Sequence, residues 1–211
     1  MKAINELYNL ETVSQNFHPQ ELLKHLLNES NISYKRELVA KGNKLFNADQ
    51  ESDKIIFISS GMVTIEKENH IYGFLQADNF IGCENMLNKN NNFFDIVTFT
   101  ETEVIIFKTS TFEAFLRQSQ EGWLYLYTQN QRMRQCLQQS YYIRRKKGTE
   151  KVLLGLQYIK SMEEESESSP IEITYSEVSN FLGIEVNSLK KTLIELKKRG
   201  IENPFQQNEV F

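Results

Sequence analysis

The spacing of hydrophobic residues changes twice along this chain, from helical to alternating and back to helical. In the first forty residues, apolar side chains recur every three or four positions after Pro19, which predicts short helices. From about Val39 the apolar side chains alternate with polar ones or form short runs, punctuated by Gly42, Gly61 and Gly73. This pattern is typical of short antiparallel strands in a sandwich or small barrel. The predicted strands span 54–59, 62–66, 93–98 and 103–107.

After Thr109 the helical spacing returns, and no Gly or Pro interrupts it between Trp123 and Lys147, which predicts one long helix. One face of this helix carries a seam with a three-and-four spacing and a single polar residue inside it. The seam residues are Leu126, Asn130, Met133, Leu137 and Tyr141. The seam either packs on the chain's own β-domain or joins two copies in a homodimer, with Asn130 as a polar register residue. We favour the homodimer.

The last forty residues carry a helix–turn–helix pattern. Thr174 and Glu177 form a capping box that starts a helix, and Gly183 fits the turn after it. In the next helix, leucines mark a buried face, and the polar side carries Asn187, Ser188, Lys190, Lys191 and Lys197. Such a helix places its N-terminal half in the major groove of DNA and uses lysines on phosphates. A solvated lysine-rich helix in a structural hairpin fits the same residues.

Composition narrows the classes of function. The 211 residues are 40% hydrophobic and the formal net charge is −4, so a DNA-binding surface must be a local basic patch. No window approaches the ~18 apolar residues of a membrane helix, and the first six residues lack a signal-peptide core, so we expect a cytoplasmic protein without a membrane partner. Two distant cysteines and three scattered histidines predict no metal site and no cofactor. With no nucleophile–base spacing or phosphate-binding glycine loop, we assign no catalytic residues and expect no enzyme.

Together these segments resemble the Crp/Fnr family of bacterial transcription regulators over nearly the whole chain. Segments 41–46 and 53–63 resemble its cyclic-nucleotide-binding-type roll, and the sequence Phe80-Ile81-Gly82 matches the residues that precede its ligand cassette. Segments 151–156 and 173–201 resemble its DNA-binding domain. The resemblance implies an α+β fold in three parts. These are an N-terminal antiparallel β-roll effector domain (1–118), a long dimerisation helix with a hinge (119–148) and a C-terminal winged helix–turn–helix (149–211).

The ligand cassette departs from the family pattern. Cyclic-nucleotide binders of the family carry a Gly-Glu pair and, about ten residues later, an Arg for the cyclic phosphate. Here Cys83 separates Gly82 from Glu84, and the segment 91–95 holds Asp95 and no Arg. Because a buried phosphate without a cation is costly, we predict that cyclic AMP and cyclic GMP do not bind. The effector pocket, for an unidentified non-nucleotide ligand or none, is assigned to Phe80, Gly82, Cys83, Glu84 and Phe93. Cys83 is either a thiol sensor or a small buried hydrophobe.

The DNA-binding helix departs as well. Val186 replaces the Arg that the family uses on guanine, whereas Asn187 can pair with adenine and Lys191 can reach a guanine edge or a phosphate. We therefore predict an A·T-leaning palindromic site with half-sites one helical turn apart. No basic residue follows Gly200, so weak, salt-sensitive binding is expected. The basic run 144–147 either contacts phosphates or forms a solvated hinge.

The sequence thus predicts a homodimeric regulator that binds double-stranded DNA, with RNA polymerase as a further candidate partner. The alternative is a regulator-derived module that binds proteins or a small ligand and no longer binds DNA. Val186 and the acidic Glu185 favour the alternative, and Asn187, Ser188 and the lysines favour DNA.

Overall fold

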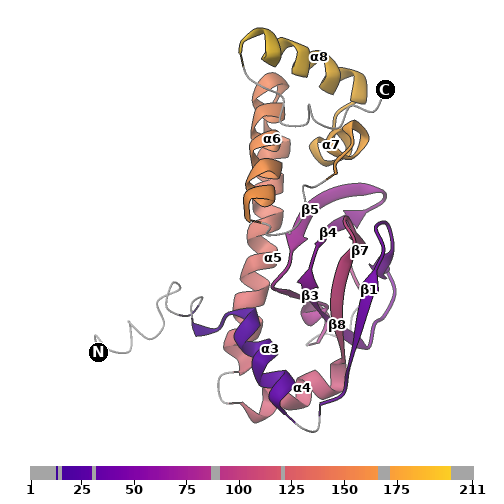
Figure 1. Cartoon of the computed structure of the whole chain (residues 1–211), viewed down its shortest axis with the longest axis vertical. Helices are drawn as coiled ribbons and strands as arrows, with labels where there is room; N and C mark the ends of the chain where they lie inside the picture. Colours follow the sequence, from indigo (N-terminus) through magenta and orange to yellow (C-terminus); the bar gives the residue numbers. More distant parts are fainter. Residues whose placement is uncertain are drawn as a thin grey trace, which may run out of the picture.

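The computed structural model describes residues 13, 16–29, 32–86, 91–119, 122–165 and 172–200. Figure 1 shows a β-rich body lying beside one long helix, with α3 and α4 at one end of the molecule and α7 and α8 at the other. Within the described residues, no helix combines the length and apolar character that crossing a membrane requires.

In the part of the chain that the structure describes, eight strands form two four-stranded antiparallel sheets, which pack face to face as a roll. The first sheet has the order β1 (Tyr34–Val39), β8 (Thr102–Lys108), β3 (Lys54–Ser60) and β6 (Asn79–Ile81). The second has the order β2 (Lys44–Phe46), β7 (Asp95–Thr98), β4 (Met62–Lys67) and β5 (His70–Gln76). Aliphatic side chains from both sheets meet inside the roll, among them Ile56, Ile58, Val63 and Ile65.

The apolar run in β3 is buried on both faces of its sheet. Since successive side chains of a strand point to opposite faces, Ile56 faces the interior of the roll while Ile55 and Phe57 face outward. The outward side chains are covered by α3 (Pro19–Asn28) and α4 (Thr109–Gln118). A strand covered on both faces is therefore continuously hydrophobic instead of alternating.

The long helix α5 (Gly122–Arg145) has 24 residues, which gives it a length of about 36 Å. It packs closely on β5 because Gly73 has no side chain at the contact: a Cβ there would lie 2.6 Å from the Cys136 Sγ. The Cys136 thiol donates a hydrogen bond to the Phe74 carbonyl (3.1 Å).

The three C-terminal helices are α6 (Gly148–Glu165), α7 (Tyr175–Leu182) and α8 (Val186–Lys198). They share one hydrophobic core with the roll, in which the rings of Phe74 and Phe181 meet at 5.1 Å in a T-shaped arrangement. The Asn180 side chain fastens α7 to the turn before β5: its Oδ1 accepts from the Ile71 N–H (2.8 Å) and its Nδ2 donates to the Asn69 carbonyl (2.7 Å). The helix–turn–helix is thus packed against the roll.

The structure confirms the antiparallel β-roll, the long helix and the capped helical pair. It places the four predicted strands as β3, β4, β7 and β8, and adds β1, β2, β5 and β6, which the spacing did not predict. The predicted wing beyond Gly200 lies outside the described residues. The domain boundaries at 118 and 148 stay predictions.

Candidate functional site

The helix–turn–helix is set by local capping chemistry. The Thr174 Oγ1 accepts from the Glu177 N–H (3.2 Å), and the Glu177 carboxylate accepts in return from the Thr174 N–H (2.7 Å), which is the predicted capping box. Gly183 ends α7 with a φ of 63°, in the left-handed region that favours glycine. The chain therefore turns sharply, and α8 begins three residues later at Val186.

One face of α8 is buried and the opposite face is open. Leu189, Leu193 and Leu196 are buried against the shared core, with Leu189 at 0% exposure. All five residues predicted to contact DNA are exposed: Asn187, Ser188, Lys190, Lys191 and Lys197. Asn187 and Lys191, four residues apart, lie on the same face, as predicted. The leucines thus orient a polar face toward solvent.

The open face of α8 is basic. Lys190, Lys191, Lys197, Lys198 and Arg199 outnumber the acidic residues of this segment, and among the described residues no ion pair neutralises them. The Lys190 Nζ lies 5.3 Å from the centre of the Tyr175 ring, a cation–π distance that leaves its charge in place. A local positive patch therefore exists on a chain whose net charge is negative.

The basic run 144–147 at the end of α5 has two intramolecular roles. The Arg144 guanidinium donates to the Ile71 carbonyl (3.0 Å) and stacks 4.9 Å from the Tyr72 ring, so it ties α5 to the roll. Lys146 pairs with Glu150 at 2.7 Å across the junction of α5 and α6. Of the two sequence interpretations, these contacts favour the hinge for Arg144 and Lys146.

The predicted seam on α5 divides into two parts. Leu126 packs into the chain's own core beside α4, as the non-dimer interpretation expects. Asn130, Met133, Leu137 and Tyr141 line a shallow, mostly apolar surface cavity of about 450 Å³. Tyr141 is 63% exposed there. Four of the five predicted seam residues therefore form a continuous outward groove.

The five residues predicted as an effector pocket differ in their burial. Phe80 and Cys83 are buried in one aromatic cluster, whereas Phe93 is 67% exposed. Gly82 has a φ of 91°, and its N–H donates to the Glu84 carboxylate (3.1 Å). None of the five lines either of the two described cavities. Burial raises the pKa of the Cys83 thiol well above its ordinary value, and Glu84 raises it further, so the structure favours the buried hydrophobe over the thiol sensor.

The segment where an anion-binding Arg would lie is tied to its neighbours. The Asn92 side chain is buried and donates to the Asn47 and Gln50 carbonyls. Asp95 accepts from the Ala48 N–H (2.7 Å) and pairs with Lys44 at 3.0 Å. Burial raises the pKa of Asp95, but this hydrogen bond and the Lys44 charge outweigh it and lower the pKa overall. The Lys44 ammonium is therefore already paired with a carboxylate.

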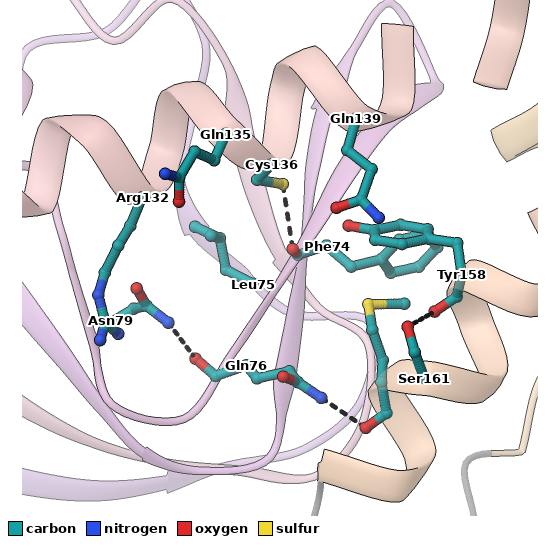
Figure 2. Close-up of a pocket in the computed structure, with 11 residues that line it drawn as sticks. Phe74, Leu75, Gln76, Asn79, Arg132, Gln135, Cys136, Gln139, Tyr158 and Ser161 are labelled. Atoms are coloured by element: carbon teal, nitrogen blue, oxygen red, sulfur yellow. Dashed lines mark hydrogen bonds between the residues drawn. The ribbon is translucent and has the colours of Figure 1, made fainter. Parts of the chain in front are cut away.

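A second cavity was not predicted from the sequence. Figure 2 shows it between β5, α5 and α6, with Arg132 extending from α5 toward Asn79 and Gln139 lying beside Tyr158. The sequence spacing of Arg132, Gln135 and Gln139 places them on one helical face. The lining residues from β5 and α6 come close to that face only in the tertiary fold, so the sequence alone does not show the cavity. Among the described residues, no cluster of three His, Cys, Asp or Glu could hold a metal ion.

These elements define a class: a β-roll with a long helix and a basic helix–turn–helix. Residues 36–119 match the family described as the cyclic nucleotide-binding domain, and no curated protein matches the chain in sequence. The chain is similar to the c-di-GMP-responsive global regulator CLP of Xanthomonas campestris, with a TM-score of 0.67 and 15% identity, covering 86% of this chain and 92% of that one. It is also similar to FixK2 from Bradyrhizobium japonicum (TM-score 0.66, 12% identity, covering 81% and 87%). A CRP-family transcriptional regulator from Thermus thermophilus gives a TM-score of 0.61 and 12% identity, covering 79% and 85%. The chain thus contains a cyclic-nucleotide-binding-type domain and shares the fold of CRP-family regulators.

Proposed function

We propose that this protein is a homodimeric, DNA-binding transcription regulator of the Crp/Fnr type. The observation that carries the proposal is α8, whose leucines are buried while Asn187, Ser188 and the lysines form an exposed basic face. A helix with this arrangement, presented by a capped partner helix and a tight turn, enters the major groove. Lysines hold phosphates there, and Asn187 pairs with adenine.

The groove on α5 supports the homodimer. It is lined by Asn130, Met133, Leu137 and Tyr141, and helices with this three-and-four spacing pair with a second copy. Two-fold symmetry then presents two α8 helices to a palindromic site, whose half-sites lie about one helical turn apart.

Cyclic nucleotide does not control the protein in this proposal. An anion at the segment 91–95 would meet the carboxylate of Asp95. The nearby Lys44 ammonium on β2 is already paired with that carboxylate. A cyclic phosphate would have to break that ion pair and would be repelled by Asp95. Calorimetric titration with cyclic AMP and cyclic GMP is expected to give no heat of binding, and micromolar affinity would contradict this part of the proposal.

DNA binding is tested by fluorescence anisotropy with a duplex selected from a random pool and a scrambled control, across a salt series. Lys190→Ala/Lys191→Ala is expected to weaken binding to both duplexes and to reduce the salt slope by about 0.9 for each phosphate that the lysines no longer neutralise. Asn187→Ala is expected to weaken only the selected duplex, by about 1–3 kcal/mol. Lys108→Ala is the charge-matched control, because this exposed lysine directly precedes α4, which lies at the opposite end of the molecule from α8 (Figure 1).

Equal, weak binding of wild type and Lys190→Ala/Lys191→Ala to both duplexes would refute the DNA proposal. It would favour the alternative, a regulator-derived module that binds proteins or a small ligand. Glu185 is the observation behind that alternative, because it precedes α8 without a side-chain capping bond and places a negative charge at the end that would enter the groove.

The dimer is tested by sedimentation velocity. Tyr141→Glu places a charge in the α5 groove and is expected to convert the dimer to a monomer. Tyr34→Glu makes the same change at an exposed tyrosine on β1 and is expected to leave the dimer intact. A monomeric wild type, or a dimeric Tyr141→Glu variant, would show that this groove is not the interface.

A further inference from the structure

The cavity between β5, α5 and α6 is separate from the DNA-binding helix and from the α5 groove. Its volume is about 260 Å³, just below the range of about 300–1,000 Å³ for small-molecule sites, so only a small ligand would fit. Its eleven lining residues come from the roll, α5 and α6, and include Leu75, Arg132, Gln135, Gln139, Tyr158 and Met162. Figure 2 shows these side chains converging from the roll, the long helix and the first helix after it.

Arg132 is the one charged side chain among those eleven residues. It is partly buried, and one hydrogen bond, from its guanidinium to the Asp78 carbonyl (3.1 Å), holds it in place. Burial lowers the pKa of this guanidinium, and the nearby Asp78 carboxylate opposes that shift. The Asp78 carboxylate itself accepts from the Gln20 amide (2.7 Å). A guanidinium has five N–H donors and stays charged, so donors remain to bind a carboxylate.

The remaining walls are of two kinds. Gln135 and Gln139 extend side-chain amides toward the cavity, and no described hydrogen bond occupies either amide. Leu75, Met162 and the Tyr158 ring add apolar surface to the lining. The lining is therefore mainly polar with a smaller apolar part, and convergent polar groups beside apolar side chains are a feature of small-ligand sites.

We propose that this cavity binds a small organic carboxylate, with the carboxylate on Arg132, an amide group between Gln135 and Gln139, and an apolar group against Leu75 and Met162. The ligand would contact the roll, α5 and α6 together. Since Gln76 already links β5 to the Met162 carbonyl (2.5 Å), the ligand would strengthen an existing contact between the roll and the C-terminal helices. Such a ligand favours the arrangement that it binds best.

The test uses three probes that each carry a carboxylate, an amide and an apolar group: hippurate, 4-acetamidobenzoate and N-acetyl-leucine. Each is paired with its primary amide, which is neutral and nearly the same size. Binding to the full chain is followed by ¹⁵N chemical-shift changes. At least one carboxylate is expected to shift residues of β5, α5 and α6 and to bind at least tenfold more tightly than its amide.

Two variants separate the site from general effects. Arg132→Gln is expected to abolish the tenfold preference for the carboxylate, whereas Arg117→Gln, an exposed arginine on α4, leaves it unchanged. Ser161→Phe fills the cavity without changing its charge and is expected to abolish binding of all probes.

No shift with any of the three carboxylates would overturn the proposal. So would equal affinity of acid and amide, or an unchanged preference in Arg132→Gln. The titration contains no DNA, so its failure leaves the proposed DNA binding untouched, and the reverse also holds.

Discussion

Replacing Asn180 by alanine tests how firmly the helix–turn–helix is fastened to the roll. The side chain bonds to the backbone of β5 and of the turn before it, at 2.8 Å to the Ile71 N–H and 2.7 Å to the Asn69 carbonyl. These groups are 109 and 111 positions away in the sequence, so the bonds exist only in the docked arrangement.

The magnitude follows from the two bonds. Each hydrogen bond contributes about 0.5–1.5 kcal/mol, so Asn180→Ala is expected to lower the free energy of unfolding by about 1–3 kcal/mol. For a chain of this size that corresponds to a fall in Tm of at least about 2 °C. Ile71 is buried, so its freed N–H has poor access to water, which favours the upper part of the range.

The assay is urea denaturation followed by circular dichroism, together with amide exchange of the Ile71 N–H. Asn187→Ala is the matched control, because this exposed asparagine lies in the next helix and has no described hydrogen bond; it is expected to stay within about 0.5 kcal/mol of wild type. If Asn180→Ala is as stable as Asn187→Ala and the Ile71 amide exchanges at the wild-type rate, the argument that Asn180 fastens the two parts is wrong.

Three further predictions concern packing and pH. Leu189→Ala is expected to lower the free energy of unfolding by about 2–5 kcal/mol in urea denaturation, because Leu189 is fully buried; a decrease of less than about 1 kcal/mol would contradict its place in the core. Gly73→Ala is expected to cost about 1–3 kcal/mol in the same assay, since the new Cβ would meet the Cys136 Sγ, and Gly73→Ala/Cys136→Ala should recover part of that stability. Asp95→Asn is expected to cost about 1–2 kcal/mol at pH 7, where the carboxylate is paired with Lys44. Because the folded-state pKa of Asp95 is lowered, the stability that its carboxylate contributes is complete above the unfolded-state pKa and is lost as pH falls through the folded-state pKa. The difference in unfolding free energy between Asp95→Asn and wild type should therefore shrink below about pH 4. A difference that stays constant from about pH 7 to about pH 3 would count against the ion pair.

The sequence predicted the elements whose signals are local. The capping box of Thr174 and Glu177, the turn at Gly183 and the leucine spacing of α8 depend only on neighbouring residues, and the structure has them at the predicted positions. The long helix was equally clear because nothing interrupts its pattern.

The elements that the sequence did not predict depend on distant partners. In β5, Gly73 weakens the strand pattern locally, yet the glycine is required there because α5 packs against it. Phe80 and Cys83 follow the expected cassette pattern, but the aromatic residues around them arrive from β3, β8 and α4 and fill the space. The Arg132 cavity brings together three segments that are separate in the sequence, and no local pattern predicts their contact.

The hydrophobic core that joins the roll to the helix–turn–helix limits how the two parts can be expressed separately or exchanged between proteins. Phe74 from the roll and Phe181 from α7 are each other's packing partners, with Tyr158 of α6 stacked on Phe181. A C-terminal fragment expressed alone would expose these rings to water and be prone to aggregate. A chimera that grafts a foreign helix–turn–helix onto this roll would need a side chain that fits against Phe74. The roll and the helix–turn–helix therefore cannot be exchanged independently. A substitution on one side of their contact is expected to be tolerated only together with a matching substitution on the other side.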